Sequence, residues 1–109
     1  MSDQGSHPPV VYKILRASEW AAFTAAGQFA GSADDLRDGF IHLYTEVQLP
    51  GTLSRHFADE PDVVIVEFEV AALGAHLRWE ASRGGALFPH LYGTLLLEGA
   101  RVRTPELGG

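Results

Sequence analysis

The chain has 109 residues, of which 46% are hydrophobic and 20% are charged, and its formal net charge at pH 7 is −6. This length is that of one domain, and the composition is typical of a globular protein rather than a disordered chain. The acidic excess disfavours nonspecific binding to nucleic-acid phosphates or anionic lipids, because both require basic patches. The absence of cysteine excludes disulfides, thiolate metal sites and a cysteine nucleophile.

Both ends of the chain differ in composition from its middle. Residues 1–9 contain neither the basic flank nor the apolar run of a secretory signal, and we expect them to form a disordered leader. Residues 105–109 are expected to form a C-terminal tail, which leaves residues 10–104 as one folded domain. No apolar run is long enough to cross a membrane. We therefore expect a cytoplasmic protein without membrane or nucleic-acid partners.

The first part of the domain alternates strands with helices. Residues 10–15 are rich in β-branched and aromatic side chains and predict a strand. A short helix follows, for which Ser18 is a suitable N-cap, Trp20 and Phe23 have helical spacing, and Gly27 is a stop signal. A stretch rich in Gly, Ser and Asp at 31–39 offers one helical turn before a second strand at residues 39–44.

The second part predicts one more helical region and several strands. Thr45 and Gln48 form a capping box, and Pro50 is expected to divide the following helix so that a second segment runs to Phe57. Residues 62–70 predict the strongest strand, which is apolar on both faces at 63–66 and therefore central in a sheet. Shorter strands are expected at 77–80, 87–92, 94–98 and 100–103. The sequence thus predicts an α+β fold, a single domain with a mixed or antiparallel sheet of five or six short strands and two or three helices.

A Phe-x-His-x-Tyr pattern occurs in two of the predicted strands. Alternate residues of a strand share a face, so each strand directs its three rings to one side. These residues are Phe40, His42 and Tyr44 in one strand, and Phe88, His90 and Tyr92 in the other. If the two faces border one cleft, it suits a ligand with a planar ring. The alternative is that they are core residues whose histidines bond to backbone carbonyls.

The opposite faces of these strands are expected to be core. The predicted core residues are Ile41, Leu43, Val64, Val66 and Phe68. We further expect the His42 ring to be half buried, with one nitrogen bonded and the other pointing into the cleft.

Charged residues outside the doubled pattern offer further chemistry, each with a simpler alternative. Arg78 and Glu80 share a strand face, and a carboxylate beside aromatic walls can stabilise a developing cation or orient a sugar hydroxyl. The alternative is an exposed Arg–Glu face of little energetic weight. The Gly-rich turn at 83–85 can hold a phosphate or be a plain turn. Arg55 and His56 are most simply solvated helix residues, and no metal-site spacing is present.

Several motifs resemble those of a known family. They are Gly-Phe-Ile-His-Leu at 39–43 and Phe-Pro-His-Leu-Tyr-Gly at 88–93, with Tyr12, Trp20, Trp79 and Glu80. Together they resemble a small bacterial family labelled domain of unknown function 952, over about residues 11–102. That family's fold is similar to the ADP-ribosyltransferase-like fold, a split α+β core with NAD in a cleft. The resemblance implies that His42, followed by Thr45, holds the nicotinamide ribose. It also implies that Tyr92 or Phe88 stacks on nicotinamide, and that Glu80 or Glu98 assists glycosidic cleavage.

Two functions remain open from the sequence. The first is binding of NAD or a related nucleotide, with ADP-ribosyltransferase-like or NAD-glycohydrolase-like activity. In that hypothesis the catalytic residues are His42, Glu80 and His90, and the ligand-binding residues are Phe40, Tyr44, Thr45, Arg78, Phe88 and Tyr92. The alternative is a noncatalytic small-ligand or protein-interaction module that retains the cleft.

Overall fold

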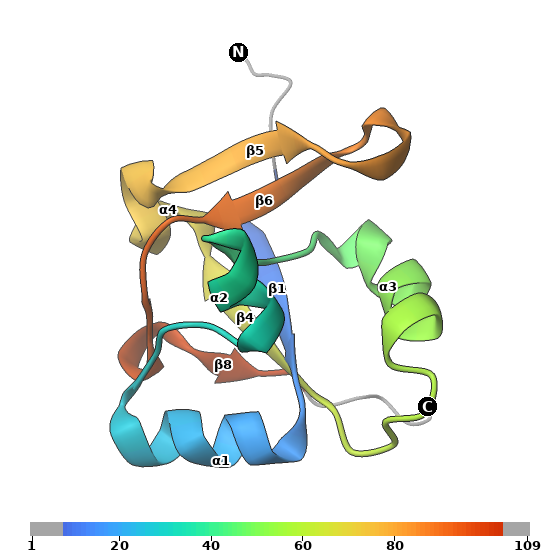
Figure 1. Ribbon diagram of the computed structural model, residues 1–109. Coiled ribbons are helices and arrows are strands. Elements are labelled where there is room, and N and C mark those ends of the chain that lie inside the picture. The colour runs from blue at the N-terminus through green and yellow to red at the C-terminus, as the bar shows by residue number, and fades with distance from the viewer. Residues whose placement is uncertain (1–7, 104–109) are drawn as a thin grey trace.

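The structure is a computed structural model that describes residues 8–103, except for the side chain of Arg83 (Figure 1). The expected tail at 105–109 lies outside the described residues, as does the expected leader apart from Pro8 and Pro9. Among the residues described, no helix has both the length and the apolar character needed to cross a bilayer.

Residues 8–103 form eight short strands and four α-helices. The strands are β1 (Val10–Leu15), β2 (Gln28–Phe29), β3 (Ile41–His42), β4 (Val64–Glu69), β5 (Leu77–Ala81), β6 (Leu87–Leu91), β7 (Leu95–Leu96) and β8 (Arg101–Val102). The α-helices are α1 (Ala17–Ala26), α2 (Ala33–Asp38), α3 (Leu49–His56) and α4 (Val70–Leu73). Four 3₁₀ turns complete the chain: η1 (Glu46–Gln48), η2 (Gly74–His76), η3 (Arg83–Gly85) and η4 (Leu97–Gly99).

The strands make three small antiparallel sheets, where the sequence led us to expect one sheet. Their strand orders are β1-β4-β8, β2-β7 and β3-β6-β5. The expectation of a single sheet was wrong because β2, β3, β7 and β8 each span only two residues, and turns or helices lead the chain away from each ladder at once. The central place of β4, predicted from its apolar residues, is confirmed.

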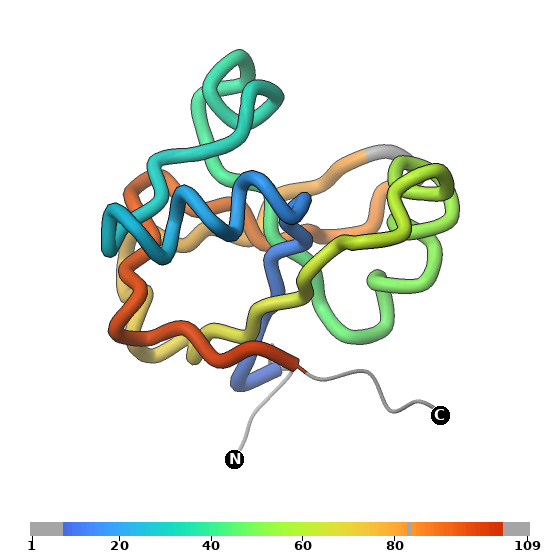
Figure 2. Tube along the Cα trace, turned by 90° about the horizontal axis from the view of Figure 1, so that it is seen from below, coloured from blue at the N-terminus to red at the C-terminus, as the bar shows by residue number. Residues whose placement is uncertain are grey.

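Two of the sheets are joined where the chain leaves β3. Tyr12 and Tyr44 form an isolated antiparallel bridge, with Tyr12 N–H donating to the Tyr44 carbonyl at 2.8 Å and Tyr44 N–H donating back at 2.9 Å. In Figure 1 the β5–β6 hairpin lies at one end of the molecule and α1 at the other, with β1 and β4 running between them. Figure 2 shows α2 projecting from the body of the chain. The bridge therefore brings the middle of β1 beside His42.

Local sequence signals explain most helix ends, with one correction. Arg16, not Ser18, precedes α1, because the Glu19 carboxylate accepts the Arg16 backbone N–H at 2.8 Å. The expected division of the helical region near Pro50 is confirmed, because η1 ends at Gln48 and α3 begins at Leu49, with Pro50 in its first turn, where no intrahelical donor is needed. The capping box of Thr45 and Gln48 is confirmed and begins η1. Neither β2 nor α4 was expected from the sequence.

The main core is built around the ring of Phe23 from α1. This side chain is fully buried and contacts Phe29 and Phe68, with ring centroids 5.6 and 6.4 Å away. Other buried members of this cluster are Val11, Leu15, Ile41, Leu43, Val66, Leu77, Leu91 and Leu95. The predicted core residues are thereby confirmed, although Val64 is only partly buried.

Replacement of Phe23 tests this packing. Phe23→Ala is expected to lower the free energy of unfolding by about 3–5 kcal/mol, because a large buried ring would leave a cavity. Urea denaturation measures the change, and Thr24→Ala, at an exposed neighbouring position, is the control with an expected change below about 0.5 kcal/mol. Equal effects of the two substitutions would contradict this description of the core.

Candidate functional site

The pairing of β3 with β6 places the two histidines of the doubled pattern directly opposite each other. His42 and His90 are register partners, and their ring centroids lie 5.9 Å apart. The Phe40 ring stacks on His90 at a centroid distance of 4.0 Å and lies 4.7 Å from His42. The predicted convergence of the two strand faces is therefore confirmed.

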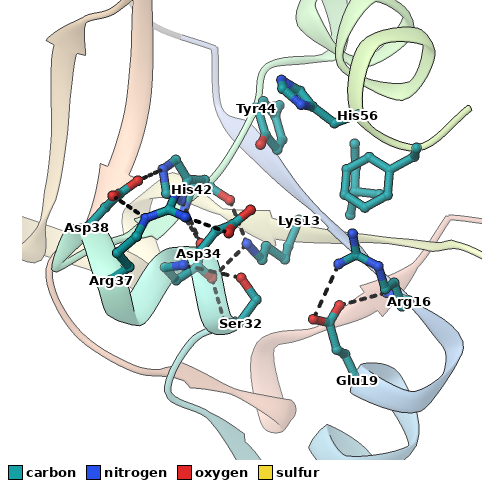
Figure 3. Close-up of a pocket in the computed structure, with 13 residues that line it drawn as sticks. Lys13, Arg16, Glu19, Ser32, Asp34, Arg37, Asp38, His42, Tyr44 and His56 are labelled. Carbon is teal, nitrogen blue, oxygen red and sulfur yellow. Dashed lines mark hydrogen bonds and ion pairs between the residues drawn. The ribbon is translucent and has the colours of Figure 1, made fainter.

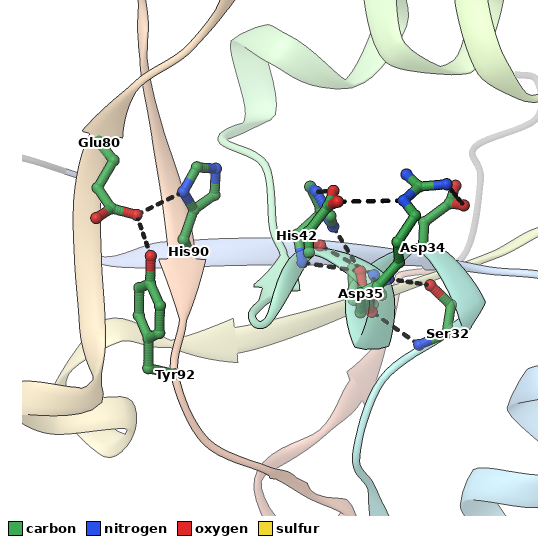
Figure 4. A network of polar contacts seen from close by, with 10 residues as sticks. Ser32, Asp34, Asp35, His42, Glu80, His90 and Tyr92 are labelled. Atoms are coloured by element: carbon green, nitrogen blue, oxygen red, sulfur yellow. Dashed lines mark hydrogen bonds and ion pairs between the residues drawn. The ribbon is translucent and has the colours of Figure 1, made fainter.

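A buried carboxylate, Asp35 of α2, organises the surroundings of His42. Its Oδ2 accepts from Lys13 Nζ at 2.8 Å and from the Ser32 backbone N–H at 2.9 Å. Its Oδ1 lies 2.6 Å from His42 Nδ1 and accepts the His42 backbone N–H at 3.1 Å. Figure 4 shows these contacts converging from α2 and β3. One carboxylate thus ties β1, α2 and β3 together.

Close approach of the backbone at Gly31 permits this arrangement. Gly31 has a φ of +133°, and a Cβ there would lie 2.9 Å from the Asp35 Cβ. A side chain at this position would displace Asp35, so glycine is required by space as well as by conformation.

The buried charges of Lys13 and Asp35 stabilise each other. Burial alone would raise the pKa of Asp35, but the His42 hydrogen bond, the charge and hydrogen bond of Lys13, and the Ser32 N–H together hold it far below its ordinary value. Burial lowers the pKa of Lys13, and the Asp35 charge opposes that shift. Asp35 is therefore a carboxylate in the folded chain.

The second nitrogen of His42 also faces a carboxylate. Nε2 lies 3.0 Å from Asp38 Oδ2, and the side chain is 26% exposed. The predicted partial burial and the hydrogen bond of one nitrogen to a side chain are confirmed, but the expectation that the other nitrogen points into the cleft without a partner is wrong. Asp35 and Asp38 are one helical turn apart on α2 and face the same ring. Only a doubly protonated imidazole can donate to both.

His90 is held differently, by a single carboxylate. Its Nδ1 lies 2.8 Å from Glu80 Oε1, which also accepts the Tyr92 hydroxyl at 2.8 Å (Figure 4). These two hydrogen bonds, that of His90 first, lower the pKa of Glu80, and the bond to Glu80 raises the pKa of Tyr92. Arg78 lies over the Tyr92 ring, 5.2 Å from its centroid. The His90 Nε2 has no hydrogen-bond partner within residues 8–103.

Two adjacent cavities meet at His42, Tyr44 and His56. The first, which we call the acidic cavity, has a volume of about 340 Å³ (Figure 3). Its lining includes Lys13, Arg16, Glu19, Asp34, Asp35, Arg37 and Asp38. The second, the histidine cavity, has a volume of about 360 Å³. It is lined by His42, Leu43, Tyr44, Thr52, Arg55, His56, Ser82, Gly84, Phe88 and His90.

Tyr44 lies between the two cavities. Figure 3 shows its hydroxyl directed into the acidic cavity, near Lys13 and His42. Burial, reinforced by the negative charges of Asp35 and Asp34, raises the pKa of this hydroxyl to about 12. Tyr44 therefore remains a neutral ring that can stack on a ligand from the histidine cavity.

The predicted site residues divide into those that line the histidine cavity and those that surround it. His42, Tyr44, Phe88 and His90 line it. Phe40, Arg78, Glu80 and Tyr92 instead contact these residues or one another. The Thr45 hydroxyl caps η1 by accepting from Gln48 N–H at 3.3 Å, and Glu98 lines a separate cavity beside Phe68.

Several residues of the site were missed in the sequence. Asp35 was interpreted only as the start of a helical turn, and Lys13, Asp38 and Thr52 were given no role. Two signals could have found the ion pair: Lys13 is the only charged residue in the otherwise apolar strand at 10–15, and Ser32 with Asp35 has the spacing of a capping box. A buried lysine requires a carboxylate partner.

No group of three or more His, Asp or Glu side chains within residues 8–103 has the arrangement needed to hold a metal ion.

Comparison with known proteins finds a family and solved relatives. The model of a family described as "Protein of unknown function (DUF952)" matches residues 14–102. The crystal structure of protein CC0527 from Caulobacter crescentus is 47% identical, covers 86% of this chain and 83% of its own, and has a TM-score of 0.82. The solution NMR structure of CC0527 is 48% identical over 84% of this chain and 79% of that one, with a TM-score of 0.76. No curated protein matches.

Removing the charge of Asp35 should destabilise the fold. In Asp35→Asn the buried Lys13 would lose its counter-ion, and we expect the free energy of unfolding to fall by about 3–5 kcal/mol. Asp38→Asn is the matched control, because Asp38 contacts the same imidazole from an exposed position and should matter much less. Urea denaturation at pH 7 measures both, and a larger effect of Asp38→Asn would refute the central role of Asp35.

The loss of stability at acid pH should also depend on the Asp35 carboxylate. The folded pKa of Asp35 lies far below the ordinary value of 3.8, so its stabilising contribution is complete above about pH 4 and is lost as the pH falls further. Between pH 4 and 2 the parent should therefore lose more stability than Asp35→Asn. The lowered pKa values of Asp38 and Glu80 contribute equally to both proteins. Parallel curves of unfolding free energy against pH would contradict this assignment.

Proposed function

We propose a nucleotide-binding function for this chain, which belongs to the DUF952 family of proteins of unknown function. In this proposal the histidine cavity holds the planar ring and the ribose of NAD or a related nucleotide. The observation that carries it is that four rings from the β3 and β6 segments line one cavity: His42, Tyr44 just after β3, Phe88 and His90. Residues that merely filled a core would leave no such space.

The aromatic part of the cavity suits a planar ring. Tyr44 and Phe88 lie edge to face, with ring centroids 6.2 Å apart and an interplanar angle of 89°. This leaves ring surface against which a heteroaromatic ligand can stack or pack edge to face. A volume of about 360 Å³ is at the lower end of the range for small-molecule pockets, so the cavity accommodates a ring and a sugar rather than a whole dinucleotide.

The polar part of the cavity suits a sugar hydroxyl. The hydrogen bond between His90 Nδ1 and Glu80 orients the ring and leaves Nε2 available to a ligand. The Tyr92 hydroxyl donates to the same Glu80 oxygen and thereby fixes the carboxylate. Because Glu80 does not line the cavity, its role in this proposal is to position His90 rather than to contact ligand.

The same geometry favours binding over glycosidic cleavage. Cleavage of the nicotinamide–ribose bond passes through an oxocarbenium-like state, which enzymes stabilise with a nearby negative charge. No carboxylate belongs to the described residues that line the histidine cavity. We therefore propose the noncatalytic alternative, a small-ligand-binding module, and propose a nucleotide as its ligand.

Ligand binding is tested by thermal shift with NAD, ADP-ribose and nicotinamide at millimolar concentration. A ligand present at 100 times its dissociation constant stabilises a protein by about 2.7 kcal/mol, so we expect NAD to raise Tm by several degrees. Phe88→Leu should reduce this shift by removing ring surface, while Leu87→Ala, on the same strand outside the cavity, should not. Absence of a shift with all three compounds would refute the proposal.

Turnover is assayed separately. Incubation of the protein with NAD should release no nicotinamide above the background rate, as measured by chromatography. Release that depends on Glu80, tested with Glu80→Gln, would instead support the transferase-like or glycohydrolase-like activity that the family resemblance implies.

A further inference from the structure

We propose that the α3 side of the histidine cavity is an anion subsite that takes a phosphate group of the bound nucleotide. We call Thr52, Arg55 and His56 the α3 wall; all three line the cavity. They lie at positions i, i+3 and i+4 of the helix and therefore share one face. The inference rests on the proposed function for the identity of the ligand, while anion binding can be tested without it.

Thr52 provides a buried hydroxyl without a partner. The residue is 6% exposed, and its hydroxyl makes no hydrogen bond within the part of the chain that the structure describes. A helical threonine commonly donates to a carbonyl one turn earlier, as Thr24 does to Ala21 at 2.9 Å. A buried polar group that remains unbonded is unfavourable, so the Thr52 hydroxyl needs an acceptor other than the described residues, which a ligand in the cavity can supply.

Arg55 provides an unpaired charge. Arg16, Arg37, Arg101 and Arg103 each form an ion pair with a carboxylate, and Arg78 lies over the Tyr92 ring. Arg55 forms neither kind of contact with any described residue. A chain with fourteen acidic and eight basic residues has ample carboxylates to pair with it. Its guanidinium at the cavity is therefore available to an anionic ligand.

The other residues that line the histidine cavity also favour an anionic ligand. The side chains of His56 and Ser82 line it without a hydrogen bond to described residues, and His90 Nε2 likewise has no described partner. The acidic side chains Asp34, Asp35 and Asp38 line the neighbouring acidic cavity instead. Those carboxylates are already paired with Lys13 and Arg37 of the same cavity, whereas the described lining of the histidine cavity holds donors and no carboxylate. A phosphate monoester or diphosphate therefore matches the guanidinium and hydroxyl donors of the histidine cavity.

The test compares two probes that differ only in a phosphate, nicotinamide mononucleotide and nicotinamide riboside, with inorganic pyrophosphate as a third. Calorimetry should show that the parent binds the mononucleotide at least about tenfold more tightly than the riboside. Arg55→Gln and Thr52→Val should remove that difference and leave riboside affinity unchanged. Thr52→Ser, which keeps the hydroxyl, should retain it. Arg101→Gln has the same charge change on β8 and is the matched control.

The possible outcomes test the anion subsite separately from the proposed nucleotide binding. If the riboside binds but its phosphate adds nothing, the subsite is refuted and nucleotide binding stands. If neither nicotinamide compound binds but pyrophosphate binds in an Arg55-dependent manner, the subsite stands and the ring argument fails. If no probe binds, or if Arg101→Gln weakens the mononucleotide as much as Arg55→Gln does, the subsite is refuted. Circular dichroism confirms that each variant is folded.

Discussion

The buried ion pair between Lys13 and Asp35 is the interaction on which the rest of the site depends. Lys13 is 4% exposed and Asp35 is 2% exposed, so neither charge is tolerated without the other. The pair fixes α2 against β1, and Asp35 then binds both the backbone and the ring of His42. The position of β3, and through it the opposing β6, follows from a contact in the wall of the acidic cavity.

The two histidines differ because of the carboxylates that surround them. His42 faces Asp35 and Asp38 through both nitrogens, so both are already engaged by side chains of α2. His90 faces Glu80 through one nitrogen, which leaves the other for a ligand. Negative charge therefore gathers on the α2 side, while the α3 side presents donors. This arrangement favours a ligand whose anionic group lies against the α3 side.

Much of the site was predictable where it depends on strand alternation. The side-chain period of two placed Ile41 and Leu43 in the core and set His42 on the opposite face, as the structure confirms. The doubled Phe-x-His-x-Tyr pattern likewise predicted that His42 and His90 would meet. The orientation of the second His42 nitrogen was not predictable, because Asp38 reaches it only once α2 is packed beside β3.

The sequence by itself determined most of the strands, their apolar faces and the convergence of two ring-bearing segments, because these follow from local periodicity. Only the tertiary structure decided which carboxylate meets which imidazole, since Asp35 is 22 residues from Lys13 and Glu80 is 10 from His90. It also decided that Thr52 and Arg55 line the same cavity as the two histidines. Contacts between residues distant along the chain depend on tertiary packing, and local sequence patterns do not predict them.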